Sequence, residues 1–427
     1  MSENKYIVRI QTARLERYLE ELPAFSLEGA KGVGKTTLAK RYAQTVFRMD
    51  DEITASLIGG TPDILRTSKK PTLIDEWQTV PSIWNSVRHL VDDDTSPGQY
   101  VLTGSAIPKK AKLHSGAGRI VRILMRPFSL IERQIAPQLI GLSDLLCGAI
   151  DIQPQKIDVS QQEYVKEILK SGFPAIRNIP ERSRNDMLDG YIDNIVEREF
   201  AELGVEVRKP EALRAWLKAY AAAEGSTASY ESIMNAATPG QDKKPAKSTT
   251  MVYRDILAAL WMLDPVKSWL SEGNLFTNLG QSPKHYLVDP AITARLLDIT
   301  EQRLLSAEGV VRVLGTQAKT IIGRLFESLI AQSLKVYADV NGMEVRHLRT
   351  VRGDHEIDFI IEQGETIIAI EAKFAPNVSN DDVKHLNWLE RSLPNRKVVK
   401  AIIYTGPYLA QRESDGVVLI PAACLGA

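Results

Sequence analysis

Residues 29–37 read Gly-Ala-Lys-Gly-Val-Gly-Lys-Thr-Thr, a glycine-rich loop with the pattern G-x-x-x-x-G-K-[ST]. The short apolar run at residues 24–27 precedes the loop, and a helix-forming run follows from Leu38. In this strand, loop and helix order, the loop N–H groups and the positive end of the helix surround phosphate oxygens. The stretch therefore predicts a phosphate-binding loop on a parallel α/β sheet.

Each part of this loop has an expected task. The glycines let the backbone turn with positive φ and approach the phosphates closely. We expect the Lys35 ammonium to neutralise the β- and γ-phosphates and the Thr36 hydroxyl to complete a Mg²⁺ shell. The candidate nucleotide-binding residues are Gly29, Ala30, Lys31, Gly32, Val33, Gly34, Lys35, Thr36 and Thr37.

Polar residues end two further strand-like runs. Residues 71–76 form an apolar run that ends in Asp75 and Glu76. We expect Asp75 to hold Mg²⁺ through water and Glu76 to polarise the attacking water. Thr103 follows the run at residues 99–102 and is the preferred γ-phosphate sensor, ahead of Ser105. The presence of a candidate base predicts hydrolysis in addition to binding.

Length and composition limit the possible domain number, partners and compartment of the protein. The 427 residues suggest about three domains. Because 53 basic residues balance 53 acidic ones, no overall excess of positive charge indicates nucleic-acid binding. Cys147 and Cys424 lack the spacing of metal ligands, which is typical of a reducing compartment. Neither a signal peptide nor a membrane span is indicated, so a soluble cytoplasmic protein is expected.

The pattern of elements divides the chain. Strand-like runs at 45–49, 72–74, 100–102 and 120–124 alternate with helical stretches such as 82–91, which predicts a parallel sheet with helices on both faces. Residues 160–205 predict helices that form a lid or linker.

A possible helix-turn-helix follows. Helices are predicted at 212–222, 230–236 and 251–263, and the runs 266–270 and 285–288 are expected to pair as a wing. Four basic residues cluster near the third helix and favour DNA contact. A helical module that packs against protein is the alternative. The basic residues are Lys243, Lys244, Lys247 and Arg254.

The last hundred residues carry a second group of polar side chains. Strands at 355–361 and 366–373 are joined by a turn at residues 363–364. Glu371 and Lys373 share one face of the return strand, and Asp358 lies across the hairpin. Two carboxylates with a lysine suit a Mg²⁺ site for phosphodiester cleavage, whereas a cross-strand ion pair is the structural alternative.

These motifs, together with Ser171–Pro174 and Ser282–Asp289, occur in the same order in prokaryotic AAA-type ATPases that carry a C-terminal domain of unknown function, and the chain resembles that family over nearly its whole length. The resemblance implies ATP as the nucleotide, a winged-helix segment and a terminal domain similar to PD-(D/E)xK nucleases. In that pattern Glu327 matches the first-helix acid, Asp358 the strand acid, and Glu371 with Lys373 the E-x-K element. The helix at 381–386 lacks the Gln and the aromatic residue that such nucleases often add.

The expected organisation is therefore a multidomain α/β protein: an AAA-like P-loop core at 1–135, a helical lid or linker at 136–205, a winged-helix-like segment at 206–300 and a nuclease-like α/β domain at 301–427. Because AAA-type sites usually lie between subunits, the resemblance also implies a homo-oligomer. Arg119 is the best candidate for an arginine finger, ahead of Arg122 and Arg126.

Three functions are compatible with these features. The leading hypothesis is an ATP hydrolase that couples turnover to DNA binding or remodelling. The alternative is an ATP switch for protein assembly or signalling with a non-catalytic C-terminal domain. The third is a Mg²⁺-dependent nuclease licensed by ATP.

Overall fold

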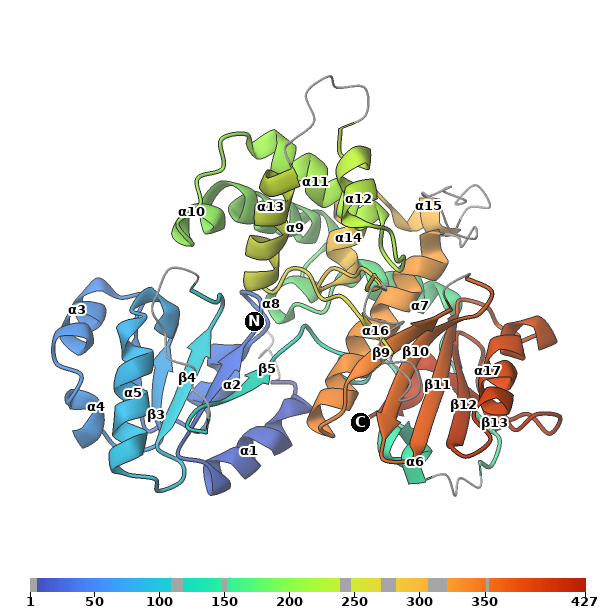
Figure 1. Ribbon diagram of the computed structural model, residues 1–427, viewed down its shortest axis with the longest axis horizontal. Coiled ribbons are helices and arrows are strands. Elements are labelled where there is room, and N and C mark those ends of the chain that lie inside the picture. Colours follow the sequence, from blue (N-terminus) through green and yellow to red (C-terminus); the bar gives the residue numbers. More distant parts are fainter. Residues whose placement is uncertain are drawn as a thin grey trace.

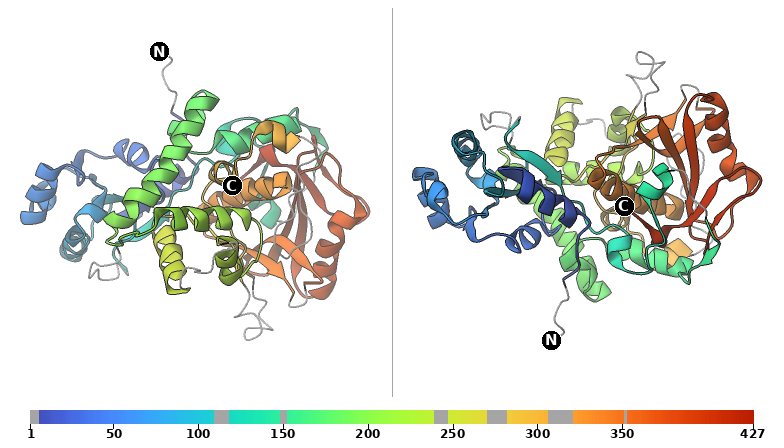
Figure 2. Two further views of the ribbon diagram at one scale, coloured as in Figure 1. Left: turned by 90° about the horizontal axis from the view of Figure 1, so that it is seen from above. Right: turned by 90° about the horizontal axis from the view of Figure 1, so that it is seen from below.

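Two separate β-sheets organise the molecule, one at each end (Figure 1). The computed structural model describes residues 6–108, 118–147, 152–238, 247–269, 282–305, 321–350 and 353–427. Views from above and below show the green and yellow helices between the two sheets (Figure 2). In the part of the chain that is described, no helix combines the length and apolarity that a membrane crossing requires. The protein is mixed α/β, as the sequence predicts.

The N-terminal sheet is entirely parallel and has the strand order β2-β3-β4-β1-β5. Its inner strands are apolar and buried on both faces, because helices cover both sides. The carboxyl ends of β1, β3 and β4 therefore meet at one edge. The strands are β1 (Ala24–Glu28), β2 (Thr45–Arg48), β3 (Thr72–Asp75), β4 (Tyr100–Gly104) and β5 (Val121–Leu124). The helices include α1 (Gln11–Glu21), α2 (Lys35–Lys40), α3 (Glu52–Gly60), α4 (Ile64–Thr67) and α5 (Ser82–Asp93).

The C-terminal sheet is mixed and has the order β7-β13-β14-β12-β11-β10-β9-β8. Alternate residues of its central strands face two different cores. Phe359 and Ile370 pack with α16 (Ile321–Val340), whereas Ile360 and Ile367 pack with α17 (Asn380–Ser392). The strands are β7 (Gln155–Lys156), β8 (Lys267–Ser268), β9 (Val345–Arg349), β10 (Glu356–Gln363), β11 (Thr366–Lys373), β12 (Lys397–Tyr404), β13 (Tyr408–Gln411) and β14 (Val418–Pro421).

The stretch predicted as a helical lid or linker, residues 136–205, is divided between two parts of the molecule. Its first portion joins the C-terminal unit: β6 (Ile140–Gly141) pairs with β15 (Leu425–Gly426), and β7 pairs with β13. This portion also contains the short helix α6 (Leu142–Cys147), and the strands were not predicted because two residues are too few to show a periodic pattern. The remainder contains α7 (Gln161–Lys170), α8 (Pro174–Arg177), α9 (Glu181–Asn194), a π-helical stretch (Ile195–Glu199) and α10 (Phe200–Glu202).

The segment predicted as winged-helix-like has the expected element order. The helices α11 (Pro210–Ala222), α12 (Tyr230–Ala236) and α13 (Lys247–Ala259) are followed by antiparallel bridges that join Leu263 to Leu287 and Val266 to Lys284. The bridged residues do not form an exposed wing. Val266 and Lys284 are fully buried, and β8 continues from the bridges into the C-terminal sheet beside β9. Lys243 and Lys244 lie outside the described residues.

Helix α16 connects the two ends of the molecule. It packs on the C-terminal sheet and is buried along most of its length. Its Ser333 hydroxyl accepts the Leu130 N–H at 2.9 Å, and the Tyr337 hydroxyl accepts the Ile131 N–H at 3.2 Å. The segment that leaves the N-terminal sheet is thus fixed directly to the core of the other unit.

A tight turn at Ser171–Pro174 lies where the parts meet. The Phe128 N–H donates to Gly172 O at 2.8 Å, and the Gly172 N–H donates to Asp289 Oδ2 at 2.7 Å. A Cβ atom at Gly172 would stand 2.9 Å from the backbone N and O of Phe128, and 2.8 Å from Pro127 Cβ. Only glycine allows this approach.

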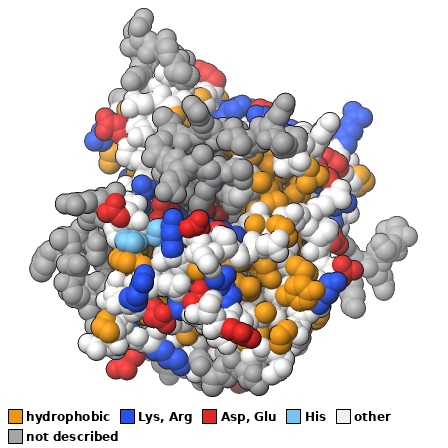
Figure 3. Space-filling view, turned by 90° about the vertical axis from the view of Figure 1, so that its right-hand side faces the viewer, with side chains coloured by type: hydrophobic (Ala, Val, Ile, Leu, Met, Phe, Trp, Pro, Cys, Tyr) orange, Lys and Arg blue, Asp and Glu red, His pale blue; other side chains and the backbone are white. Residues whose placement is uncertain are grey.

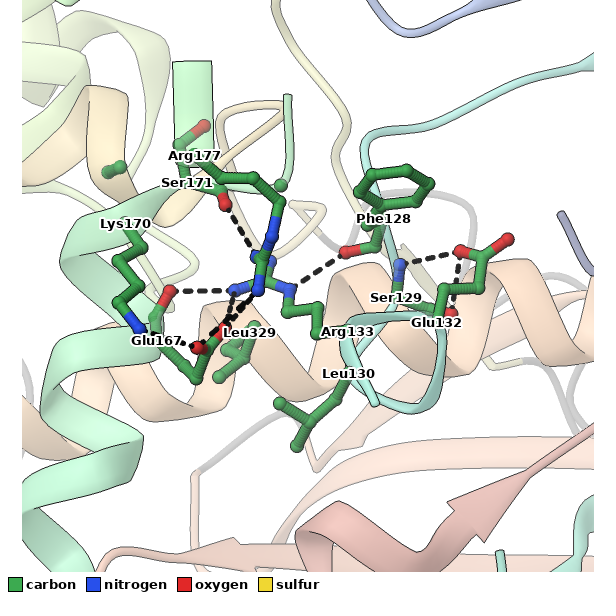
Figure 4. Close-up of polar contacts among 12 residues, drawn as sticks. Phe128, Ser129, Leu130, Glu132, Arg133, Glu167, Lys170, Ser171, Arg177 and Leu329 are labelled. Carbon is green, nitrogen blue, oxygen red and sulfur yellow. Dashed lines mark hydrogen bonds and ion pairs between the residues drawn. The ribbon is translucent and has the colours of Figure 1, made fainter. Parts of the chain in front are cut away.

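An ion-pair cluster holds the same turn from below (Figure 4). The buried Glu167 carboxylate faces the guanidinium groups of both Arg133, at 3.5 Å, and Arg177, at 3.2 Å. Arg133 also donates to Glu167 O at 2.6 Å, and Arg177 donates to Ser171 O at 3.1 Å. Burial raises the pKa of Glu167, but the two arginines and Lys170 outweigh it and lower that pKa overall. The carboxylate therefore stays charged and ties α7 to the turn.

We predict that Gly172→Ala destabilises the protein by about 1–3 kcal/mol, because the methyl group must push apart two backbones that lie in contact. Denaturant unfolding measures the loss. Gly190→Ala is the matched control: Gly190 lies inside α9 with open space around its Cα, and this substitution should be neutral or slightly stabilising. Equal free energies of unfolding of the two variants would contradict the conclusion that position 172 requires glycine.

Candidate nucleotide site and C-terminal acidic cluster

The glycine-rich loop has the shape that phosphate binding requires. Gly34 has a φ of 99° and begins α2, and Gly29 has a φ of 144°. A Cβ atom at Gly29 would lie 2.2 Å from the carbonyl oxygen of Met125, which follows β5. These positions therefore need glycine, and the loop wraps around the N-terminus of α2.

Lys35 points back into this loop. Its ammonium donates to Gly29 O at 2.8 Å and to Ala30 O at 2.9 Å, and the residue is 4% exposed. Burial lowers the pKa of Lys35 to about 8 despite the attraction of Glu76 and Asp75. The ammonium is thus held at the centre of the loop.

The Asp75 carboxylate joins the loop to the neighbouring strand. Its Oδ1 accepts from the Thr36 hydroxyl at 2.6 Å and from the Thr103 hydroxyl at 2.5 Å. Thr103 Oγ1 also accepts the Glu76 N–H at 3.2 Å. The structure therefore brings Thr36, Asp75 and Thr103 together, as their positions at one sheet edge predict.

Glu76 is positioned by two side chains. Its Oε2 accepts from the Ser105 hydroxyl at 2.8 Å and from the Gln78 amide at 2.5 Å. Its backbone is left-handed, with a φ of 56°, so the carboxylate turns away from the line of the strand. Sequence reasoning missed Gln78. Its place two residues after the acidic pair was the available signal.

A cavity of about 790 Å³ opens beside these groups. Its wall on the sheet side includes Lys31, Glu76, Gln78 and Ser105. The helical segment supplies the opposite wall, which consists of Glu202, Leu203, Gly204 and Leu260. The candidate site is therefore shared between the parallel sheet and the helices above it.

Lys31 of the loop contacts the helices directly. Its ammonium lies 3.2 Å from Glu199 Oε1 and 3.3 Å from Glu202 Oε2. The Tyr191 hydroxyl donates to Lys31 O at 3.2 Å. Burial lowers the pKa of Lys31, but attraction to the two carboxylates outweighs it and raises that pKa. Glu199 lies in the π-helical stretch, an irregularity that often marks functional positions.

The three arginines considered as fingers all have partners within the chain. Arg119 pairs with Asp92 at 2.7 Å, and Arg122 pairs with Glu28 at 3.1 Å. Arg126 makes a two-pronged contact with Asp264. Arg119 and Arg122 remain partly exposed, whereas Arg126 is largely buried. The assignment of Arg119 as a finger stays a prediction.

Two of the predicted C-terminal acids, Glu327 and Asp358, lie around a lysine. We define the acidic cluster as Glu327, Glu356, Asp358 and Glu371. The Lys284 ammonium lies 2.9 Å from Glu327, 2.8 Å from Asp358 and 3.2 Å from Glu356. Glu371 pairs instead with Lys373, at 3.3 Å.

The role of Lys284 was missed because its partners Glu327 and Asp358 lie 43 and 74 positions away in the sequence. Among the described residues, no three His, Cys, Asp or Glu side chains are arranged to hold a metal ion. The predicted second Mg²⁺ site, with Asp358 and Glu371 as ligands, stays a prediction.

Comparison with known proteins finds three family models that match separate parts of the chain. A family model described as an AAA domain matches residues 22–134, and models for domains of unknown function, DUF8612 and DUF4143, match residues 161–303 and 322–425. Uncharacterized proteins of Mycobacterium tuberculosis and Mycobacterium bovis are each 25% identical over 431 residues, covering 97% of this chain and 83% of the relative.

Two solved structures show more distant likeness. A Walker-type ATPase of Pyrococcus abyssi is 15% identical, with 69% of this chain and 97% of that chain covered and a TM-score of 0.41. The Aeropyrum pernix ORC2 protein is 12% identical, with 69% and 96% covered and a TM-score of 0.28. TM-scores this low carry no weight in assigning the fold.

The loop, the strand order and the AAA match together identify residues 22–134 as an AAA-type P-loop ATPase domain. This particular chain joins that ATPase to a C-terminal domain of the DUF4143 type.

We predict that ATP affinity depends on the protonation of Lys35. Bound phosphates favour the ammonium, so the pKa of Lys35 is higher in the complex than the value of about 8 in the free protein. Affinity should be constant below that pH and fall above it, by up to about tenfold per pH unit. Titration with a non-hydrolysable ATP analogue measures this. Lys35→Arg, whose guanidinium does not titrate, should bind more weakly but with a flat pH profile. A flat profile in the wild type would contradict the prediction.

Proposed function

We propose that this protein is a Mg²⁺-dependent ATP hydrolase that passes its nucleotide state to the helical segment and, through it, to the C-terminal domain. The observation that carries the proposal is the paired placement of Asp75 and Glu76. Asp75 contacts the Thr36 hydroxyl of the loop, while Glu76 is held separately at the cavity by Ser105 and Gln78. This separation gives the two carboxylates different tasks.

The loop supports nucleotide binding. Its backbone N–H groups and the start of α2 would face the phosphates, and the Lys35 ammonium would exchange its contacts with Gly29 O and Ala30 O for phosphate oxygens. The Thr36 hydroxyl and the Asp75 carboxylate, 2.6 Å apart, are hard oxygen donors that fit Mg²⁺. When bound, Mg²⁺ neutralises charge on the phosphates.

Glu76 supports hydrolysis. Ser105 and Gln78 both donate to the same oxygen, Oε2, so the carboxylate is oriented toward the cavity while Oε1 remains available to accept a proton from water. Thr103 bridges Asp75 and the Glu76 backbone, so it fits the predicted role of sensing the γ-phosphate by linking the two carboxylates.

Lys31 supports a relay to the helices. It belongs to the loop that would enclose the phosphates, yet its ammonium contacts Glu199 and Glu202. Triphosphate oxygens close to Lys31 would compete with these carboxylates. Binding would then weaken the hold on the π-helical stretch, and loss of the γ-phosphate would restore it.

A second function, coupling of ATP turnover to DNA, has one observation in its favour. The order of α11, α12 and α13 followed by two antiparallel bridges is that of a winged-helix module. The surface gives less support. Arg254 is engaged by Asp255 at 2.8 Å and lies over the Tyr230 ring. On the face formed by the C-terminal sheet, acidic and basic side chains stand side by side (Figure 3).

We predict that Lys35→Ala abolishes turnover and weakens nucleotide binding, whereas Glu76→Gln binds ATP normally and loses turnover by about a hundredfold or more. Lys35 meets charge that is present before and during the reaction, but Glu76 acts only on the attacking water. Phosphate release and equilibrium binding separate the two effects. Near-normal turnover in the Glu76→Gln variant would exclude Glu76 as the base.

The same assay, repeated with single-stranded and with duplex DNA, tests the second function. That function requires one of the two DNAs to stimulate ATP turnover.

We predict that Mg²⁺-ATP, added to the Glu76→Gln protein, slows hydrogen exchange in the loop and speeds it in residues 195–202. A Glu76→Gln, Lys31→Ala double variant should keep the loop protection, and residues 195–202 should exchange fast with or without nucleotide. Lys40→Ala, which changes a lysine at the far end of α2, is the matched control and should behave as the parent. A nucleotide response at 195–202 that persists without Lys31 would exclude this relay.

A further inference from the structure

The Lys284 ammonium is a fully buried charge at the centre of the acidic cluster. The residue is 0% exposed, and Glu327 and Asp358 are each 1% exposed. Its three carboxylate partners come from two elements, Glu327 from α16 and both Glu356 and Asp358 from β10. The ammonium donates hydrogen bonds to Glu327 and Asp358, and Glu356 adds a third ion pair.

Two neutral groups also donate hydrogen bonds to these carboxylates. Glu327 Oε1 also accepts from the Tyr286 hydroxyl at 2.6 Å, and Asp358 Oδ2 accepts the Ala372 N–H at 3.1 Å. Burial lowers the pKa of Lys284, but attraction to Asp358, Glu327 and Glu356 outweighs it and raises that pKa well above its ordinary value. Without this cation, the buried carboxylates of Glu327 and Asp358 would face each other with one compensating charge fewer, which is strongly unfavourable.

A divalent metal ion would use the same oxygens differently. Mg²⁺ takes carboxylate oxygens at about 2.0–2.1 Å and demands a nearly octahedral shell. Here the oxygens surround a nitrogen at 2.8–3.2 Å, so the acids are spaced for an ammonium group. Glu371, the remaining acid, has its own cation in Lys373.

We infer that Lys284 is a built-in counter-ion that takes the place of a divalent cation between Glu327 and Asp358, so that the acidic cluster is complete without metal. The C-terminal domain then keeps the acids of a metal site but binds no metal there while Lys284 is in position.

The backbone around Lys284 fixes this arrangement. Lys284 and Val266 exchange both backbone hydrogen bonds at 2.9 Å, and the Gly225 N–H donates to His285 O at 2.8 Å. Removing the ammonium therefore requires movement of the segment Ser282–Asp289. The end of that segment, Asp289, accepts the Gly172 N–H of the turn beneath the phosphate-binding loop.

A cavity lies beside the acidic cluster. It has a volume of about 260 Å³ and reaches Asp358 and Glu371. Charged and titratable groups from several elements face it, and they include cations as well as acids. These groups are Arg324, Arg349, Glu356, Lys373, Asp381, Asp382, Lys384 and His385.

Mn²⁺ binding to the nucleotide-free protein tests the inference. Lys284→Met should lower the melting temperature and create a Mn²⁺ site, so that saturating Mn²⁺ raises its melting temperature by about 3–6 °C. The wild type should show no such shift. Adding Glu327→Gln and Asp358→Asn to Lys284→Met should remove the gain, because the new site consists of these acids.

Lys335→Met is the matched control for the loss of a buried lysine. Lys335 is paired with Asp264 at 3.0 Å, and Asp264 keeps Arg126 when Lys335 is removed. This variant should lose stability without gaining Mn²⁺ binding.

Three outcomes would overturn the inference: equal Mn²⁺ binding by the wild type and Lys284→Met, no Mn²⁺ gain in a folded Lys284→Met protein, or metal-dependent DNA cleavage by the wild type that is lost in Asp358→Asn. If Lys284→Met does not fold, the wild type and Lys284→Arg decide the question by equilibrium dialysis against Mn²⁺. Both proteins retain a cation at position 284. A Mn²⁺ site in either protein contradicts the inference if Asp358→Asn removes that site. The absence of such a site from both proteins supports the inference.

Discussion

The contact on which the rest of the structure depends is the close approach of Gly172 to the backbone of Phe128. This turn touches three parts of the molecule at once. Phe173 lies against the glycine-rich loop, Gly172 binds Asp289 through its N–H, and Ser171 O is held by Arg177. Neither neighbouring backbone can withdraw without breaking a hydrogen bond. The nucleotide site and the C-terminal unit therefore share one rigid junction.

Two buried ion-pair groups lie on either side of this junction. Glu167 with its two arginines lies beneath the turn, and Lys284 with its carboxylates lies at the other end of the segment that holds Asp289. Buried charges of this kind add little net stability, but each tolerates only one arrangement of its partners. These ion pairs fix the relative positions of the N-terminal and C-terminal units more than they add to the stability of the contact between them.

The sequence was sufficient for features that depend on near neighbours. The loop at 29–37, the carboxylates after β3 and the hydroxyls after β4 lie in short stretches whose strand ends must meet in a parallel sheet, so Asp75, Thr36 and Thr103 were predicted together. The five predicted N-terminal strands and the C-terminal hairpin were found for the same reason.

Features that depend on distant partners were not predictable from one sequence. Lys284 reaches Asp358 across 74 positions, and Lys31 reaches Glu202 across 171. Neither partner lies at a spacing that a helix or strand would show. The strands β6 and β7 have two residues each, too few for any periodicity, and their partners lie near the other end of the chain.

The pairing of β6 with β15 and of β7 with β13 makes the C-terminal unit discontinuous along the gene. Residues 139–147 and 152–157 supply part of its core and one edge of its sheet, and β8 supplies the other edge. The matched family segment, in contrast, begins only at residue 322. A recombination event that exchanged the last hundred residues alone would leave both edges of the sheet behind. Such an exchange would succeed only between relatives whose middle portions still fit, so the ATPase and its C-terminal partner are expected to be inherited as one block.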